Sequence, residues 1–234
     1  MRKTLYTLQV NGYSERITRL TFPLIKYWAS KIGAEFHVIR DRKFPDWPIT
    51  YEKLQIHELG RLHGNDWNIF LDADTLVHPH MFDPTVFLKK DTVAHNGHDF
   101  APVRWQYDEY FLRDGRNIGS GNWIAIASDW CLDFWRPLDI GPEEAIAKIY
   151  PIVEELRGGC LADHLVDDYA MSRNIARYGL KFKGVLDIQK EIGWTGEWGG
   201  FMHLYNISEA EKVEKIMEEL DKWKIPAAIR QYGE

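Results

Sequence analysis

The chain has 234 residues, 45% hydrophobic and 27% charged, a composition typical of one globular domain. Its formal net charge of −6 argues against nucleic acid as the main partner, because phosphate-binding surfaces carry an excess of basic residues. No stretch approaches the ~20 apolar residues of a transmembrane helix, and the N-terminus lacks a signal-peptide pattern. With only two cysteines, a disulfide framework is not expected either, which favours a reducing, cytoplasmic compartment.

The N-terminal third predicts alternating strands and helices. Strands are expected at 5–10, 36–39 and 67–71, and helices at 17–32 and 51–62. Pro23 is expected to kink the first helix or to mark the start of a new one, and Leu62 is expected on the inward face of the second. This order favours parallel strands with right-handed crossovers. We therefore expect an α/β fold with a mostly parallel central sheet flanked by helices.

The rest of the chain is less regular but predicts further elements. Strands are expected at 123–127 and 181–186, and helices at 129–135, 143–156 and 163–178. A last helix begins with the capping box Ser208-x-x-Glu211 and ends at Pro226. The sequence therefore predicts one domain over 1–226 and a loosely ordered C-terminal tail over 227–234.

Two aspartates, Asp72 and Asp74, follow the third predicted strand directly. Carboxylates beside a buried strand are costly unless a counter-charge compensates them, and a divalent cation with oxygen ligands is the usual one. A solvated turn is the alternative, because aspartate is common in turns. The apolar strand before the pair favours the metal, since open sheets bind ligands at the carboxyl ends of their strands.

The segments YEKL at 51–54 and FLDADTLV at 70–77 resemble the retaining GT-A glycosyltransferases that include glycogenin and bacterial lipopolysaccharide galactosyltransferases. The resemblance implies a single-domain GT-A fold and hexosyl transfer from a nucleotide-diphosphate sugar, expected to be a UDP-sugar, with retention at the anomeric carbon. It also implies that Asp72 and Asp74 hold Mn²⁺ or Mg²⁺ against the diphosphate. Lys53 is then expected to reach the donor's phosphate or sugar, and Ala73 to line the donor site.

Further donor-binding positions follow from the same resemblance. Val10, Asn11 and Tyr13 follow the first strand, where the family binds the base, and Tyr13 is similar to its uracil-stacking tyrosine. Packing of that ring on the sheet is the alternative. Ser120, in a Gly-Ser-Gly turn, resembles the family's Asn-Ser-Gly turn beside the donor sugar, with Gly119 in place of asparagine. A plain tight turn is the alternative there.

The catalytic and remaining metal-binding positions lie in the second half. Asp167 and Asp168 resemble the family's Asp-Gln pair near the anomeric carbon, where a carboxylate can act as nucleophile or stabilise positive charge; exposed helix charges are the alternative. His203 resembles the third metal ligand and favours Mn²⁺ over Mg²⁺; a buried structural histidine is the alternative. Trp194 and Trp198 lie in a glycine-rich segment with the composition of a lid.

The sequence departs from the family after His203, where a glycine and a Lys-Pro-Trp motif are missing. Phosphate neutralisation is then expected to rest on Lys53, the metal or an unassigned arginine. Two other functions stay open. One is a haloacid-dehalogenase-type phosphatase with Asp72 as nucleophile, although such proteins usually carry the motif on their first strand; the other is a non-catalytic nucleotide-sugar-binding domain. The acceptor, whether glycan, lipid-linked or protein, is not identified, and 95–116 is expected to carry its selectivity.

Overall fold

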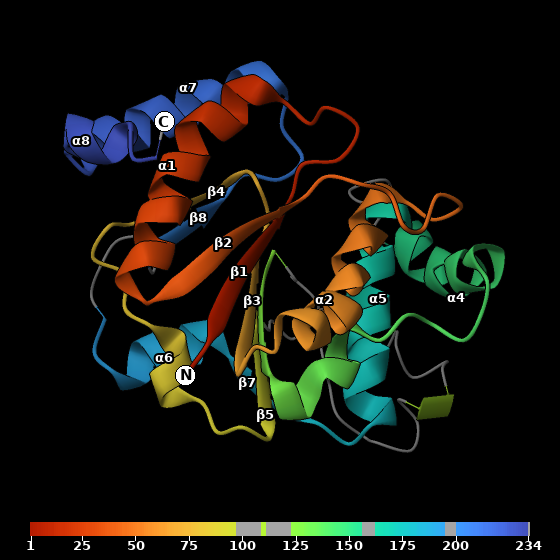
Figure 1. Cartoon of the computed structure of the whole chain (residues 1–234). Coiled ribbons are helices and arrows are strands. Elements are labelled where there is room, and N and C mark those ends of the chain that lie inside the picture. Colours follow the sequence, from red (N-terminus) through yellow and green to blue (C-terminus); the bar gives the residue numbers. More distant parts are fainter. Residues whose placement is uncertain (97–108, 111–122, 156–161, 195–199, 234) are drawn as a thin grey trace.

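The computed structural model describes residues 1–96, 109–110, 123–155, 162–194 and 200–233 (Figure 1). The strands are β1 (Lys3–Leu8), β2 (Ala34–Ile39), β3 (Trp67–Leu71), β4 (Thr75–Val77), β5 (Thr92–His95), β6 (Ile124–Ser128), β7 (Lys181–Gly184) and β8 (Phe201–His203). The α-helices are α1 (Glu15–Lys31), α2 (Ile56–His63), α4 (Pro142–Glu155), α5 (Ala162–Arg177), α6 (Val185–Glu191), α7 (Glu209–Lys222) and α8 (Ala227–Arg230). Shorter 3-10 helices are η1 (Ile49–Gln55), η2 (Pro84–Phe87) and η4 (Asp129–Trp135).

The described strands form a six-stranded sheet in the order β2-β1-β3-β6-β5-β7, and a small antiparallel pair of β4 and β8. β6 runs antiparallel to both of its neighbours, β3 and β5, whereas the other pairings in the large sheet are parallel. Helices cover both faces of this sheet (Figure 1). The predicted mixed α/β fold with a mostly parallel central sheet flanked by helices is confirmed.

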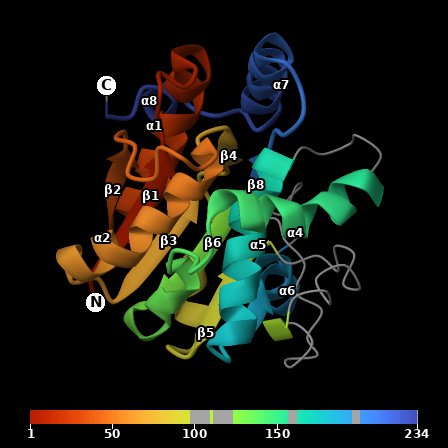
Figure 2. The same ribbon diagram turned by 90° about the vertical axis from the view of Figure 1, so that its right-hand side faces the viewer.

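Alternation along the strands divides the core between the two faces of the sheet. Leu5 in β1 packs with α1 and α6, through residues such as Trp28 and Ile188. Its neighbour Tyr6 points to the opposite face and packs with η1, η4 and α5, through residues such as Phe134. A third cluster joins α7 to α1, and both α7 and α8 lie beside α1 in two perpendicular views (Figure 1, Figure 2). Burial on both faces explains why β1 and β3 are buried along their whole length.

Two local expectations about the N-terminal helices were wrong. Helix α1 does not restart at Pro23 but runs through it as one element, since packing of the flanking Phe22 and Ile25 against the sheet offsets the missing hydrogen bond. Leu62, expected to face inward, is 79% exposed. The predicted single helix is a 3-10 helix that continues as α2, and the change from 120° to 100° per residue rotates the later positions away from the core.

The C-terminal part also differs from the sequence prediction in detail. The strand expected over 181–186 ends at Gly184, and α6 begins at the next residue. Residues 227–230, expected in a loose tail, form α8, and Lys26 Nζ on α1 donates a 2.8 Å hydrogen bond to Gly233 O. Rings of Tyr27 and Tyr232 meet edge to face at 5.5 Å. Within the described ranges, no helix combines the length and hydrophobicity that crossing a bilayer requires.

Candidate functional site

The candidate site lies where β3 ends, at the carboxyl edge of the parallel strands. The turn after β3 is fixed from two sides, since Asp72 N donates to Trp123 O at 2.8 Å and Thr21 Oγ1 on α1 donates to Ala73 O at 2.6 Å. This turn leads into β4, and antiparallel pairing with β8 places His203 opposite the first residue of β4. Backbone pairing therefore brings a distant histidine beside the aspartate turn.

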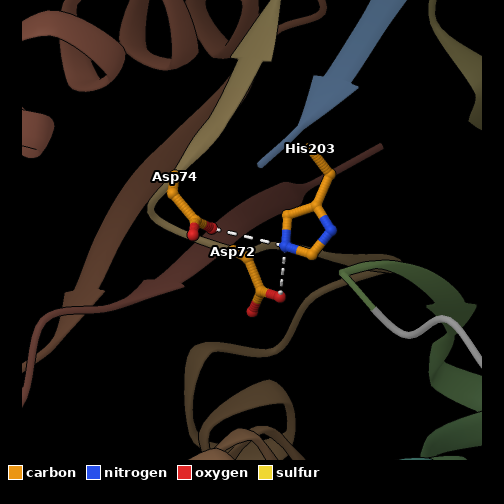
Figure 3. Close-up of side chains that lie close together, drawn as sticks. All are labelled: Asp72, Asp74 and His203. Carbon is orange, nitrogen blue, oxygen red and sulfur yellow. Dashed lines mark ion pairs between the residues drawn. The ribbon is translucent and has the colours of Figure 1, made fainter. Parts of the chain in front are cut away.

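The side chains of Asp72, Asp74 and His203 converge on one point (Figure 3). His203 Nε2 lies 3.4 Å from Asp72 Oδ2 and 3.4 Å from Asp74 Oδ1. One ligand atom from each residue lies within 4.8 Å of the other two, and no second group of three such residues occurs in the described part of the chain. The structure thus brings together the three residues that the sequence predicts as metal ligands.

This arrangement fits a divalent cation. Ligand atoms at right angles about a cation, with metal–ligand distances of about 2.1–2.4 Å, lie about 3.0–3.4 Å from one another. The two separations of 3.4 Å at His203 fall at the upper end of that range. Two carboxylates with one imidazole suit Mn²⁺ better than Mg²⁺, because nitrogen ligands favour transition metals. Three protein ligands also leave coordination positions for oxygen atoms of a bound substrate.

A buried lysine links the aspartate turn to helix α5. Lys53 on η1 is 4% exposed, and its Nζ lies 2.7 Å from Asp167 Oδ2 and 3.1 Å from Asp72 Oδ1. Burial alone would lower the pKa of Lys53, but the charges of Asp167 and Asp72 raise it above its usual value. Burial raises the pKa of Asp167, and Lys53 opposes that shift. The predicted catalytic pair is therefore not a set of exposed helix charges, since Asp168 is also buried.

The ring of His203 contacts two aromatic rings. Its ring stacks on Trp123 with centroids 5.5 Å apart and on Tyr205 with centroids 5.8 Å apart. Burial opposes its protonation, but hydrogen bonds to Asp72 and Asp74 raise the pKa of His203 to about 9. Burial raises the pKa of both aspartates, but nearby positive charges outweigh it, so both pKa values are lowered. Lys53 and His203 have this effect at Asp72, and His203 and Lys212 have it at Asp74. Without a metal ion, the protonated imidazole is thus one of the positive charges that compensate the pair, together with Lys53 at Asp72.

Another cation, absent from the sequence prediction, reaches the cluster from α7. Lys212 Nζ forms an ion pair with Asp74 Oδ2, and the Lys212 side chain is 14% exposed. The sequence did not indicate it, because α7 carries many charged residues and reads as a solvated surface helix. One signal existed, since Lys212 is spaced four residues before the buried Ile216 and shares its helix face.

The predicted base-binding segment lies at the end of β1. Val10 is buried, whereas Asn11 and Gly12 are exposed and adopt φ of 53° and 70°, a left-handed conformation that asparagine and glycine tolerate best. Tyr13 is partly buried and packs against two apolar clusters. Burial, with the neighbouring charge of Asp74 and a hydrogen bond to it, raises the pKa of the Tyr13 hydroxyl. Tyr13 therefore packs on the fold and also contacts a candidate metal ligand.

Some predicted positions lie outside the described residues. Ser120, with its flanking glycines, falls in the segment 111–122, and Trp198 falls in 195–199. Trp194 is described and partly buried, with its ring 6.4 Å from that of His78. The predicted roles of these residues stay predictions.

Among known proteins, similarity to this chain is found in solved structures and not in curated sequences. No protein family and no curated protein sequence matches the chain. A solved structure described as that of a glycosyltransferase involved in the glycosylation of the major capsid of PBCV-1 superposes with a TM-score of 0.50 and 15% identity, covering 92% of this chain and 99% of that one. A197 from STIV has a TM-score of 0.38 at 14% identity over 79% and 81% of the two chains, too low to support an argument. The chain therefore shares its fold with a glycosyltransferase.

Proposed function

We propose that the protein is a metal-dependent glycosyltransferase that moves a sugar, most simply a hexose, from a UDP-sugar to a glycan, lipid-linked or protein acceptor, with retention at the anomeric carbon. The observation that carries this proposal is the convergence of Asp72, Asp74 and His203 at the carboxyl edge of the parallel strands. Ligands of open α/β sheets bind at that edge, and the fold is shared with a glycosyltransferase.

Each charged residue of the site has a role in this reaction. Asp72, Asp74 and His203 hold the cation, Mn²⁺ or Mg²⁺, which when bound offsets negative charge on the departing diphosphate. Lys53 holds Asp72 and Asp167 in fixed positions, through contacts of 3.1 and 2.7 Å. Fixed charges of this kind stabilise a transition state without reorganising during the reaction.

Of the two predicted carboxylates on α5, Asp167 is the better placed to bind a hydroxyl of the donor sugar. It is 2% exposed, and its Oδ2 is held by Lys53, whereas its Oδ1 is buried and has no hydrogen-bond partner among the described residues. A buried acceptor without a donor is costly, so a donor from a bound ligand would be favourable. We therefore propose that Asp167 Oδ1 accepts a hydrogen bond from a hydroxyl of the donor sugar. Asp168 is then the candidate nucleophile or charge stabiliser.

The phosphatase alternative fits the site less well. Phosphatases of this type usually carry the nucleophilic aspartate on the first strand of the fold, whereas Asp72 follows β3. The phosphatase alternative also gives no role to His203 or to the ion pair of Lys53 with Asp167. The transferase proposal uses both.

The test is hydrolysis of nucleotide sugars, a slow side reaction that needs no acceptor. Purified protein is incubated with a panel of UDP-, GDP-, ADP- and dTDP-sugars and Mn²⁺, and the released nucleoside diphosphate is measured. We expect release from one UDP-sugar, its loss with EDTA, and its loss in Asp74→Asn. Asp187→Asn, at an exposed position on α6, is the matched control and should retain the rate. Full activity of Asp74→Asn would refute the metal role, and phosphate release from simple phosphomonoesters would favour the phosphatase.

A further inference from the structure

Lys212 occupies an unusual position for a lysine. It lies in the N-terminal part of α7, just after the capping box of Ser208 and Glu211, where the helix dipole disfavours positive charge. It shares a helix face with the buried residues Ile216 and Leu220, so an apolar side chain would fit the packing pattern there. A charged group in this partly buried position destabilises the fold unless an anionic partner compensates its charge. In the structure that partner is Asp74.

This ion pair competes with a metal ion for the charge of Asp74. Asp74 Oδ1 faces His203 at 3.4 Å, and Oδ2 is held by Lys212. A divalent cation at Asp74 would come close to the ammonium group, and the two positive charges repel each other strongly in a partly buried site. Cation binding therefore weakens the contact between Lys212 and Asp74. The ammonium group is then uncompensated unless it binds another anion.

Of the lysines that contact the candidate metal ligands, Lys212 is better able than Lys53 to change partners. Lys53 is 4% exposed and bridges two carboxylates, one of which, Asp167, lies outside the candidate metal ligands. Lys212 forms an ion pair with Asp74, the carboxylate that the cation would bind, and its side chain is 14% exposed to solvent. The flexible four-carbon stem of lysine allows its ammonium group to move as a point charge.

We propose that Lys212 is a diphosphate-binding residue that exchanges partners: it neutralises Asp74 in the cation-free protein and binds a phosphate oxygen once a cation and nucleoside diphosphate are bound. This inference rests on the proposed function and assigns the phosphate neutralisation that the sequence leaves to Lys53, the metal or an unassigned arginine. The new partner is anionic and arrives with the cation, so a charge-assisted hydrogen bond replaces the one that the cation displaces.

If Lys212 exchanges partners, its replacement should change the affinities for Mn²⁺ and for UDP in opposite directions. In Lys212→Met the cation no longer competes with an ammonium group for Asp74, so Mn²⁺ alone should bind more tightly, by about threefold to tenfold. UDP in the presence of saturating Mn²⁺ should bind more weakly, by about tenfold, because one charge-assisted contact is lost. A lysine that serves only to hold α7 in place would not raise one affinity and lower the other.

The experiment measures both affinities in the full chain. Mn²⁺ binding is followed by electron paramagnetic resonance of the free ion, and UDP binding at saturating Mn²⁺ by calorimetry, for wild type, Lys212→Met and Lys212→Arg. Lys212→Arg keeps the charge and should stay close to wild type in both. Lys215→Met, an exposed lysine of the same helix, is the matched control and should change neither.

The outcomes separate this inference from the proposed function. A wild-type protein that does not bind UDP with Mn²⁺ overturns the proposed function, and this inference with it. A wild-type protein that does bind, with a Lys212→Met variant whose UDP affinity is unchanged, overturns the inference alone. Parallel loss of both affinities in Lys212→Met also overturns it, because that result means damage to the site.

Discussion

Replacement of Lys53 by methionine tests the charge balance of the site through stability alone. Methionine is similar in length and apolar, so the change mainly removes the ammonium group that lies 2.7 Å from Asp167 and 3.1 Å from Asp72. Two carboxylates then lose their common counter-charge, and one of them, Asp167, is 2% exposed. Removing one partner of a buried ion pair costs about 3–5 kcal/mol. For a domain of this size that corresponds to a fall in Tm of about 6–20 °C.

The assay is thermal and urea unfolding in EDTA at pH 7, followed by circular dichroism. The double variant Lys53→Met with Asp167→Asn should recover at least half of the loss, because it removes one of the two unpaired charges. Lys183→Met, which breaks the more exposed pair with Glu191 on the same protein, is the matched control and should cost less than about 1 kcal/mol.

The pH dependence of the stability of Lys53→Met is a second test of the same charge balance. Burial raises the pKa of Asp167, and without Lys53 that shift grows. A carboxyl group whose folded pKa is raised adds stability at low pH and loses it as pH rises through the folded value. The deficit of Lys53→Met should therefore shrink between pH 7 and pH 5. A loss below about 1 kcal/mol at pH 7, or no recovery in the double variant, would refute the charge balance described for this site.

Three further predictions concern the cation and α7. Tyr205→Ala removes one of the rings stacked on His203 and should weaken Mn²⁺ binding about tenfold, whereas Tyr205→Phe should not; paramagnetic resonance measures both, and equal behaviour would contradict the stacking role. Because His203 must lose its proton to bind a metal and its pKa is about 9, Mn²⁺ affinity should rise about tenfold per unit from pH 6 to 8; a flat profile would exclude it as a ligand. Ser208→Ala removes the α7 cap and should cost about 1 kcal/mol in urea unfolding; no change would argue against the cap.

The parts of the fold that the sequence predicted are those with strong local patterns. β1, α1 and β2 follow from hydrophobic periodicities that persist over several turns or a whole strand, and the capping box of Ser208 and Glu211 is present in the structure. The errors occur where the local geometry changes within an element. Leu62 was assigned to the core because the pattern does not reveal that a 3-10 helix precedes α2 and rotates it. β4 and β8 were missed because each has three residues, too few for a periodic signal.

The residues of the candidate site were predictable where a chemically distinctive side chain follows a recognisable strand or matches a family motif. Asp72 and Asp74 stand out as carboxylates after a buried strand, and His203 was added by resemblance; the structure brings the three together. The contacts that tune them were not predictable, because they depend on tertiary packing. Lys212 reaches Asp74 only because α7 packs against α1. Tyr205 follows the end of β8, which is at His203, so the stacking of its ring on His203 depends on a loop conformation that the sequence does not give.

The central claim is that Asp72, Asp74 and His203 hold one divalent cation that binds a nucleoside diphosphate. The most direct measurement is a crystal structure of the protein with Mn²⁺ and UDP, with the manganese located by its anomalous scattering. We expect one manganese peak within about 2.4 Å of an oxygen of each aspartate and of His203 Nε2, in contact with the diphosphate. A peak bound elsewhere, or UDP bound away from these three residues, would contradict it.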